Sequence, residues 1–208
     1  MTFAQEGFEV CHNIVNVARI ESIRKKMISI MAPHCNCAVD QKDSLDRCFY
    51  DISAQGQALK SNVYRLFGRL ADLPLLLSEK GISEKVSALG FSRFTIQAYS
   101  VFCREPGNTK HVFLPHQDLR DRTSRKSLIL WVPLSSGSDV GGLAIYPGTH
   151  AKGPLKHGLS DSGQLMLNQS TYADSERQEI TNYGIGDCVF VDPYLIHESV
   201  QNSGTSIR

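Results

Sequence analysis

The stretch GDCVFVDPYLIHESV, residues 186–200, decides the fold class. It holds a short β-branched and aromatic run over 188–191, with Gly186 before it and Pro193 after it. Runs of this length between turn-forming residues are typical of β-strands. Because His197 follows the strand and the Pro193 turn, we expect it to lie at the mouth of a β-barrel or sandwich.

Other segments of the second half have the same texture. Residues 91–103, 127–134 and 142–148 are β-branched or aromatic runs bounded by Gly, Pro, Asp and Ser. The polar stretch 151–178 between them is rich in Ser, Gly, Asn and Gln, and we interpret it as a loop and a candidate lid. The pattern predicts a mainly β core with antiparallel strands over residues 91–208.

The first half predicts helices instead. Apolar residues recur at helical steps over 14–31 and 57–77, and residues 83–90 resemble a capped helix closed by a glycine. Residues 33–50 are less regular, and we predict a loop there. Residues 1–90 are therefore expected to form a helical support layer for the β core, within a single domain over 1–208.

The composition excludes several classes of protein. The chain has 208 residues, 41% hydrophobic and 21% charged, with a net charge of +1, as in a soluble globular protein. That balance favours neither nucleic acid nor an anionic membrane as a partner. No apolar run is long enough for a transmembrane helix, and the N-terminus does not resemble a signal peptide, so we expect a cytoplasmic protein.

The six cysteines have irregular spacing, which predicts reduced thiols in a cytosolic protein. His34, Cys35, Cys37 and Cys48 can be imagined as a zinc site. Without a paired C-x-x-C spacing, we interpret them as scattered loop and core residues.

The segment FLPHQDLR, residues 113–120, places a histidine and a carboxylate two positions apart. In an extended chain His116 and Asp118 point to the same face. With His197 they would form a two-histidine, one-carboxylate set, which covers one face of an octahedral metal and leaves three positions open. These ligand types suit Fe(II), although both histidines can also be ordinary polar residues.

Four segments of the second half resemble the phytanoyl-CoA dioxygenase family of Fe(II)/2-oxoglutarate oxygenases. They lie in the family's order: an H-x-D segment, the strand after it, a glycine-led strand ending in a PGTH turn, and a final segment with H-x-S, Q-N and Arg. In this sequence they are PHQDL (115–119), LILWVPL (128–134), GGLAIYPGTHAKG (141–153) and GDCVFVDPYLIHESVQNSGTSIR (186–208). The resemblance implies a double-stranded β-helix, the jelly-roll fold of the cupins, for the β core.

The resemblance also implies an activity. His116, Asp118 and His197 would be the iron ligands, and the co-substrates would be 2-oxoglutarate and O2. Decarboxylation to succinate and CO2 would accompany oxidation of a small molecule. Related halogenases lack the carboxylate ligand, so Asp118 favours hydroxylation or another oxidation over halogenation.

Four further residues would contact the co-substrate by the same resemblance. Arg208 would bind the distal carboxylate of 2-oxoglutarate, with Ser199 adding a hydroxyl, and a planar guanidinium suits that role. Trp131 and Tyr99 would lie nearby, although each can also be a core residue. In the family the chain continues past this arginine, so the barrel would be completed by further residues or closed in another way.

The substrate is less defined. Basic residues after the H-x-D segment can form a rim for an anionic substrate, but Asp121 interrupts them and we interpret a solvated loop. They are Arg120, Arg122, Arg125 and Lys126, with Lys110 and Lys152 as further candidates. Two other functions stay open: a non-catalytic small-molecule-binding barrel, and a cupin-type metal enzyme that does not use 2-oxoglutarate. The sequence does not indicate an oligomeric state.

Overall fold

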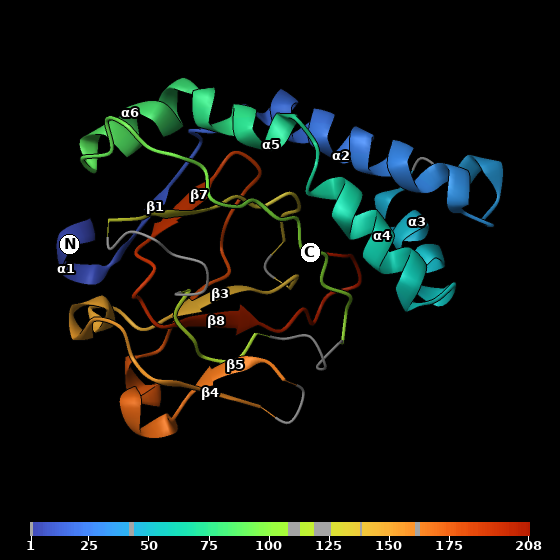
Figure 1. Cartoon of the computed structure of the whole chain (residues 1–208). Helices are drawn as coiled ribbons and strands as arrows, with labels where there is room; N and C mark the ends of the chain where they lie inside the picture. Colours follow the sequence, from blue (N-terminus) through green and yellow to red (C-terminus); the bar gives the residue numbers. More distant parts are fainter. Residues whose placement is uncertain (1, 42–43, 108–112, 119–125, 138, 161–162) are drawn as a thin grey trace. The chain divides into compact units, whose positions relative to one another are not determined.

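The computed structural model describes residues 2–41, 44–107, 113–118, 126–137, 139–160 and 163–208. The chain divides into two compact units (Figure 1). Residues 1–13 and 104–208 form the first, here called the β unit, and residues 14–103 form the second, here called the helical unit. None of the helices in the described ranges is long and apolar enough to cross a membrane.

The β unit contains two three-stranded antiparallel sheets and a two-stranded hairpin (Figure 1). One sheet has the order β1-β7-β2, the other has the order β6-β3-β8, and β4 pairs with β5. The strands are β1 (Phe8–Cys11), β2 (Ile129–Trp131), β3 (Gly142–Ile145), β4 (His157–Leu159), β5 (Leu165–Leu167), β6 (Gln178–Ile180), β7 (Cys188–Val191) and β8 (His197–Val200). Short helical segments accompany them: α1 (Phe3–Glu6), η4 (Thr149–Lys152), η5 (Gln169–Thr171) and η6 (Asp174–Glu176).

One apolar cluster joins the two three-stranded sheets. All four residues of β7 are buried, which matches a continuous apolar run rather than an alternating one. The cluster contains side chains from both sheets, so the sheets pack face to face. Its members are Ile145, Val189, Val191 and Leu195, with Phe8, Val10, Ile129, Trp131, Leu143 and Ile180 packed against them.

The predicted strands within 127–134, 142–148 and 188–191 are confirmed, but four other expectations for the chain differ from the structure. No strand forms over 91–103, which lies in the helical unit; there the Tyr64 hydroxyl bonds both the N–H and the carbonyl of Cys103. A β-rich run becomes a strand only beside a partner strand, and the sequence alone does not supply one.

Short strands also form where no strand was predicted. Residues 8–11, expected in the helical layer, form β1 and pair antiparallel with β7. The stretch 151–178, expected as a loop, contains the β4-β5 hairpin. Strands of three or four residues carry too little periodicity to be recognised by that signal alone, whereas the predicted strands of equal length were marked by β-branched and aromatic residues between turn residues.

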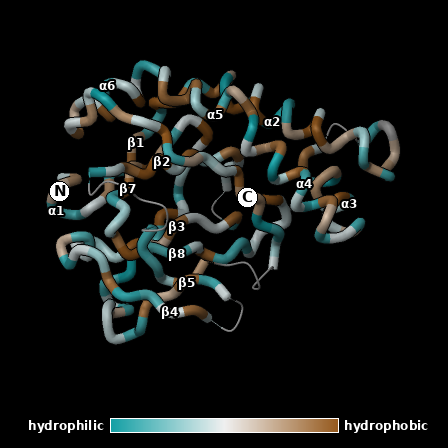
Figure 2. Tube along the Cα trace, in the orientation of Figure 1, coloured by the Kyte–Doolittle hydropathy of each residue, from teal (hydrophilic) through white to brown (hydrophobic). Residues whose placement is uncertain are grey.

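The helical unit contains four helices of nine or more residues, together with shorter turns of helix. The longest, α2, buries Ile20, Ile23, Met27 and Met31 along one stripe, and its brown and teal segments alternate in Figure 2. The elements are α2 (Val17–Met31), η1 (Ala32–His34), η2 (Val39–Gln41), α3 (Leu45–Ala54), α4 (Gln57–Phe67), α5 (Asp72–Leu75), η3 (Leu76–Ser78) and α6 (Lys80–Ala88).

The helix α3 corrects the predicted loop over 33–50. Its N-cap Ser44 accepts a hydrogen bond from the backbone N–H of Arg47, and the helix buries residues at steps of three and four. The cap and the spacing of Leu45, Cys48 and Ile52 are both readable in the sequence. The helix has only ten residues, so its pattern of buried positions repeats too few times to stand out in the sequence.

Candidate metal centre

The two histidines of the predicted ligand set are joined through their backbones. The N–H of His116 donates to the carbonyl of His197, and the N–H of His197 donates to the carbonyl of His116, each at 3.0 Å. This isolated antiparallel bridge places the two imidazole rings with centroids 4.4 Å apart. The N–H of Asp118 donates to the carbonyl of Pro193 at 3.1 Å, which holds the carboxylate residue beside the same turn.

The ligand atoms of these three residues converge. The Nε2 atom of His116 lies 3.5 Å from Oδ1 of Asp118, and the Nε2 atom of His197 lies 3.6 Å from Oδ2. All three ligand atoms lie within 4.8 Å of one another. The structure therefore brings together residues that the sequence places on separate segments.

Hydrogen bonds at the far side of each ring orient the two imidazoles. The Nδ1 atom of His116 lies 2.7 Å from the carbonyl oxygen of Leu114, and that of His197 lies 3.0 Å from the carbonyl oxygen of Leu195. A carbonyl only accepts, so each Nδ1 is the donor in its bond and each Nε2 faces the cluster. Two Nε2 atoms beside a carboxylate are the donor set that a cation requires.

The electrostatics of Asp118 agree with this arrangement. Burial raises the pKa of its carboxyl, but hydrogen bonds with His116 and His197 outweigh that effect and hold the pKa below its ordinary value. The Asp118 side chain is 43% exposed, whereas those of His116 and His197 are 12% and 11% exposed. The cluster therefore opens toward solvent on its carboxylate side.

Gln117, between the two ligands of the H-x-D segment, points the other way and is 1% exposed. Its side-chain amide donates to the carbonyls of Gly153 and Tyr194 and accepts from the N–H of Leu155, while its own N–H donates to Nε2 of His157. These bonds fix the segment that carries His116 and Asp118. Sequence reasoning passed over this residue, although its alternate position in an extended segment was the signal.

The predicted co-substrate residues fall in different places. Ser199 is buried two positions after His197 on β8, so the two side chains share one face, and its N–H donates to the carbonyl of Phe113. Trp131 packs against the core between the sheets. Tyr99 lies in the helical unit and is 43% exposed.

Arg208 is held at the edge of the β3-β8 pair. Its Nη1 donates to the carbonyl of Gly142 at 2.6 Å and to that of Val200 at 2.9 Å. Its backbone N–H and carbonyl bond reciprocally with those of Arg104. Burial lowers the pKa of its guanidinium below the ordinary value, so this cation has lost hydration and would gain from an anionic partner.

Tyr183 connects two of the predicted co-substrate residues and was missed by the sequence analysis. Its ring packs edge-on against Trp131 with centroids 5.0 Å apart, and its hydroxyl donates to the carbonyl of Gly141. Burial raises the pKa of Tyr183, and the nearby charge of Arg208 opposes part of that rise. No motif marks this tyrosine in the sequence.

Most of the basic rim cannot be placed. Lys110, Arg120, Arg122 and Arg125 lie outside the described residues, whereas Lys126 is exposed. The Nζ of Lys152 donates to a carbonyl of η5, which is an ordinary surface contact.

Known proteins resemble this chain in sequence pattern and in fold. The model of the family described as phytanoyl-CoA dioxygenase (PhyH) matches residues 4–208. The chain belongs to that family. The predicted family membership is confirmed, and the match includes the first half, in which the sequence analysis found no motif. No curated protein matches the chain.

Solved structures share the fold of this PhyH family member at low identity. They include the non-heme monooxygenase ThoJ in a nickel complex, with 15% identity, a TM-score of 0.67, and coverage of 99% of this chain and 71% of that one. The carbocyclase SnoK, described as non-heme and alpha ketoglutarate dependent, has 16% identity, a TM-score of 0.61, and coverage of 99% and 78%. The epimerase SnoN, in complex with Fe3+, alpha ketoglutarate and nogalamycin RO, has 15% identity, a TM-score of 0.64, and coverage of 99% and 77%.

Proposed function

We propose that the protein is an Fe(II)/2-oxoglutarate-dependent oxygenase that oxidises a small molecule. The observation that carries the proposal is the convergence of His116, Asp118 and His197, with both Nδ1 atoms bonded to backbone carbonyls. The family match and the cofactors named for SnoN support it. The jelly-roll architecture of the β unit is part of the same proposal and agrees with its two facing sheets.

His116, Asp118 and His197 would hold the metal through Nε2 and carboxylate oxygens. When bound, Fe(II) with 2-oxoglutarate and O2 supplies the oxidising chemistry, with succinate and CO2 as products. The reciprocal backbone bridge fixes the distance between the histidines before the metal arrives. Gln117 holds the intervening segment from the opposite side through four hydrogen bonds, so little reorganisation is needed when the metal binds.

Arg208 and Ser199 would bind the distal carboxylate of 2-oxoglutarate. Among the described residues the hydrogen bonds to Gly142 and Val200 both use Nη1, so the Nε and Nη2 groups of the guanidinium would bind a carboxylate side by side. Ser199 presents its buried side chain on the face of β8 that also carries His197. Trp131 and Tyr183 would limit the space beside this carboxylate through their packed rings.

The outcome of the oxidation is the least constrained part of the proposal. We favour hydroxylation because Asp118 supplies the carboxylate ligand. Relatives described as a carbocyclase and an epimerase make ring formation and stereochemical inversion the competing outcomes. The segment 151–178 would border the site, since the hairpin residue Leu167 donates its N–H to the carbonyl of Pro115.

The decisive experiment is an anaerobic titration of the metal-free protein with Fe(II) and 2-oxoglutarate. Chelation of iron by a keto acid gives a visible charge-transfer band, which we expect for the wild type and not for His197→Ala. Arg208→Lys should keep iron binding and weaken the affinity for 2-oxoglutarate by about 10–100-fold, because it loses charge-assisted hydrogen bonds.

The other outcomes separate the alternatives. Iron binding without the band would favour a cupin-type enzyme that uses different chemistry. Failure of the wild type to bind iron would favour a binding barrel without catalysis.

A further inference from the structure

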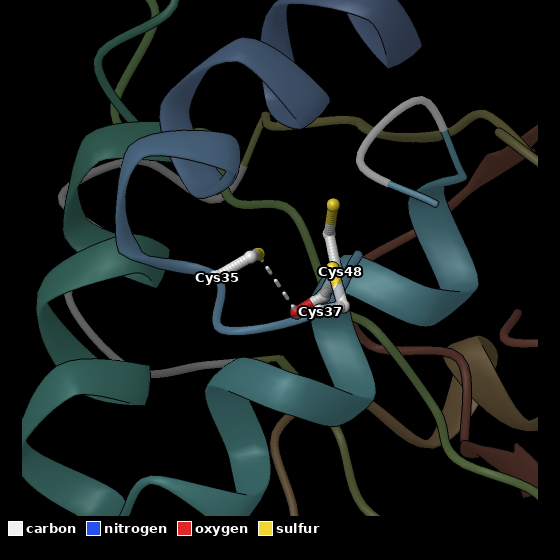
Figure 3. Close-up of side chains that lie close together, drawn as sticks. All are labelled: Cys35, Cys37 and Cys48. Carbon is white, nitrogen blue, oxygen red and sulfur yellow. Dashed lines mark hydrogen bonds between the residues drawn. The ribbon is translucent and has the colours of Figure 1, made fainter. Parts of the chain in front are cut away.

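Three cysteines meet within the helical unit, remote in sequence from the candidate metal centre. Cys35 and Cys37 lie between η1 and η2, and Cys48 lies in α3 (Figure 3). Their sulfur atoms all lie within 4.8 Å of one another. The three thiols are therefore gathered rather than scattered, although they do lie in a loop and in the core, as interpreted from the sequence.

Polar contacts hold the loop of this thiol cluster against α3. The N–H of Asn36, between Cys35 and Cys37, donates to Oδ2 of Asp51 at 2.6 Å. Gln55 donates from one Nε2 to the same carboxylate oxygen and to the carbonyl of His34. The two bonded backbone groups, the carbonyl of His34 and the N–H of Asn36, lie on either side of Cys35 in the sequence. These bonds therefore fix the C-x-C loop beside the helix that carries the third cysteine.

Two of the three thiols are buried in the helical unit. Cys48 is 0% exposed, Cys35 is 6% exposed, and Cys37 is half-buried. The Sγ of Cys35 donates to the carbonyl of Met31 at 3.3 Å and to that of Cys48 at 3.7 Å, the second of which is the dashed line in Figure 3. Two thiols thus lie inside the unit and the third lies at its edge, where an ion from solvent can enter.

No disulfide forms among the six cysteines, all of which the structure describes. A disulfide would use two of these thiols and leave the third, whereas all three sulfurs lie within 4.8 Å of one another. Around a tetrahedral zinc ion, Zn–S bonds of about 2.3 Å place the sulfurs about 3.8 Å apart. A contraction of about 1 Å or less from the observed limit would create that geometry.

We propose that Cys35, Cys37 and Cys48 bind a thiophilic metal ion, with Zn2+ as the natural occupant. Three thiolates occupy three tetrahedral positions, and a solvent molecule at the side of Cys37 occupies the fourth. Soft sulfur ligands favour zinc over iron(II), so this site and the His116–Asp118–His197 site select different metals.

Binding would remove a proton from each thiol. Burial, with smaller contributions from Cys48 and Cys37, raises the pKa of Cys35 to about 12. Burial also raises the pKa of Cys48. A dication supplies the charge that three thiolates need in this setting, and it would join the C-x-C loop to α3.

Cobalt(II) tests the proposal because thiolate ligands give it an intense near-ultraviolet charge-transfer band, which imidazole and carboxylate ligands do not. We expect one equivalent of Co2+ to produce the band in the reduced, metal-free protein, and Zn2+ to abolish it. The band should persist in the His116→Ala/His197→Ala double variant, so the result does not depend on the proposed oxygenase function.

Cys37→Ser is the decisive variant because Cys37 is half-buried and its replacement leaves the packed thiols in place. We expect it to fold, by far-ultraviolet circular dichroism, and to lose Co2+ affinity by at least the roughly 10–100-fold that an outer-shell partner is worth. Cys11→Ser, which removes a thiol from β1, is the matched control and should keep the band.

Two results would overturn the proposal. One is the lack of a thiolate band in wild-type protein whose six thiols are shown by a thiol-reagent assay to be reduced. The other is a band of unchanged intensity and affinity in folded Cys37→Ser.

Discussion

At the scale of single residues, the candidate metal centre depends on what lies behind the ligands as much as on the ligands. His116, Asp118 and His197 could be selected from the sequence by residue type and spacing, and the structure brings their ligand atoms together. The alternation of an extended segment indicates that Gln117 points away from the ligands, but not what it binds, because its side-chain partners are backbone groups of Gly153 and other residues distant in sequence. Residue type and spacing are enough to predict candidate metal ligands, whereas the fold is needed to identify the contacts of a residue that positions them.

Gln117→Leu should destabilise both the fold and the metal site. The variant leaves the carbonyls of Gly153 and Tyr194 and the N–H of Leu155 without their present partner, at about 1–3 kcal/mol for each buried group. We expect the free energy of unfolding, measured by urea denaturation, to fall by about 3 kcal/mol. Iron affinity should fall by about 10–100-fold.

Gln169 supplies a matched control, since it is exposed and its side chain bonds to the side chains of Asp174 and Tyr172 nearby in sequence. Gln169→Leu should leave both quantities nearly unchanged. Equal behaviour of the two variants would contradict a positioning role for Gln117.

At the scale of elements, the sequence predicted best the elements that carry a signal within one segment. The helices α2 and α4 and the strands β2, β3 and β7 lie within predicted segments, and α6 overlaps the predicted 83–90. The signal was a helical spacing of apolar residues for the helices, and a β-branched or aromatic run between turn residues for the strands. The strand predicted over 91–103 does not form, because a strand also needs a partner elsewhere in the chain and the segment itself does not show whether one exists.

The β3 strand shows how element geometry enters the site. A Cβ on Gly142 would lie 2.0 Å from the carbonyl oxygen of Ile180, so this position requires glycine for close pairing with β6. The carbonyl of Gly142 also accepts the hydrogen bond from Arg208. The glycine-led strand therefore places its backbone against both its neighbour strand and the predicted co-substrate arginine.

Gly142→Ala should disrupt this pairing. The clash is with a backbone atom, so the strand must move, and we expect a loss of about 2–4 kcal/mol in the free energy of unfolding together with weaker 2-oxoglutarate binding. Urea denaturation and the charge-transfer titration measure the two effects.

Gly158→Ala is the comparison, because a Cβ at this exposed hairpin position meets nothing within 4 Å. It should change stability by less than about 0.5 kcal/mol. Similar losses in the two variants would show that the β3–β6 contact is not the cause.

At the scale of the whole molecule, each compact unit contains a carboxylate with a lowered pKa. In the helical unit, a hydrogen bond from Lys26 lowers the pKa of Asp72 against the opposing effect of burial. In the β unit, burial raises the pKa of Asp187, but bonds from the N–H groups of Gly184 and Asn13 and from His12 lower it overall. The family match covers both units, whereas their boundary after Cys103 was not readable from composition.

The molecule should therefore lose stability in acid. A carboxyl group with a depressed folded-state pKa stabilises the fold above its unfolded pKa of about 3.9, and that contribution is lost as the pH falls through the folded value. We expect urea midpoints to be level between about pH 7 and pH 5 and to fall below about pH 4.

Asp72→Asn and Asp187→Asn identify the source of this acid dependence. Each should lower stability by about 1–2 kcal/mol at neutral pH and flatten the decline in acid. A decline as steep as in the wild type in both variants would assign the acid dependence to other groups.

The bridge between His116 and His197 has a consequence for the order of folding. It closes a long loop of chain, and contacts between residues distant in sequence form late because their closure costs the most entropy. The proposed metal site would be completed only when β8 has docked, so a nascent or partly unfolded chain would offer iron at most the two ligands of the H-x-D segment. Iron uptake during refolding would then report the last step of assembly of the β unit rather than its initial collapse.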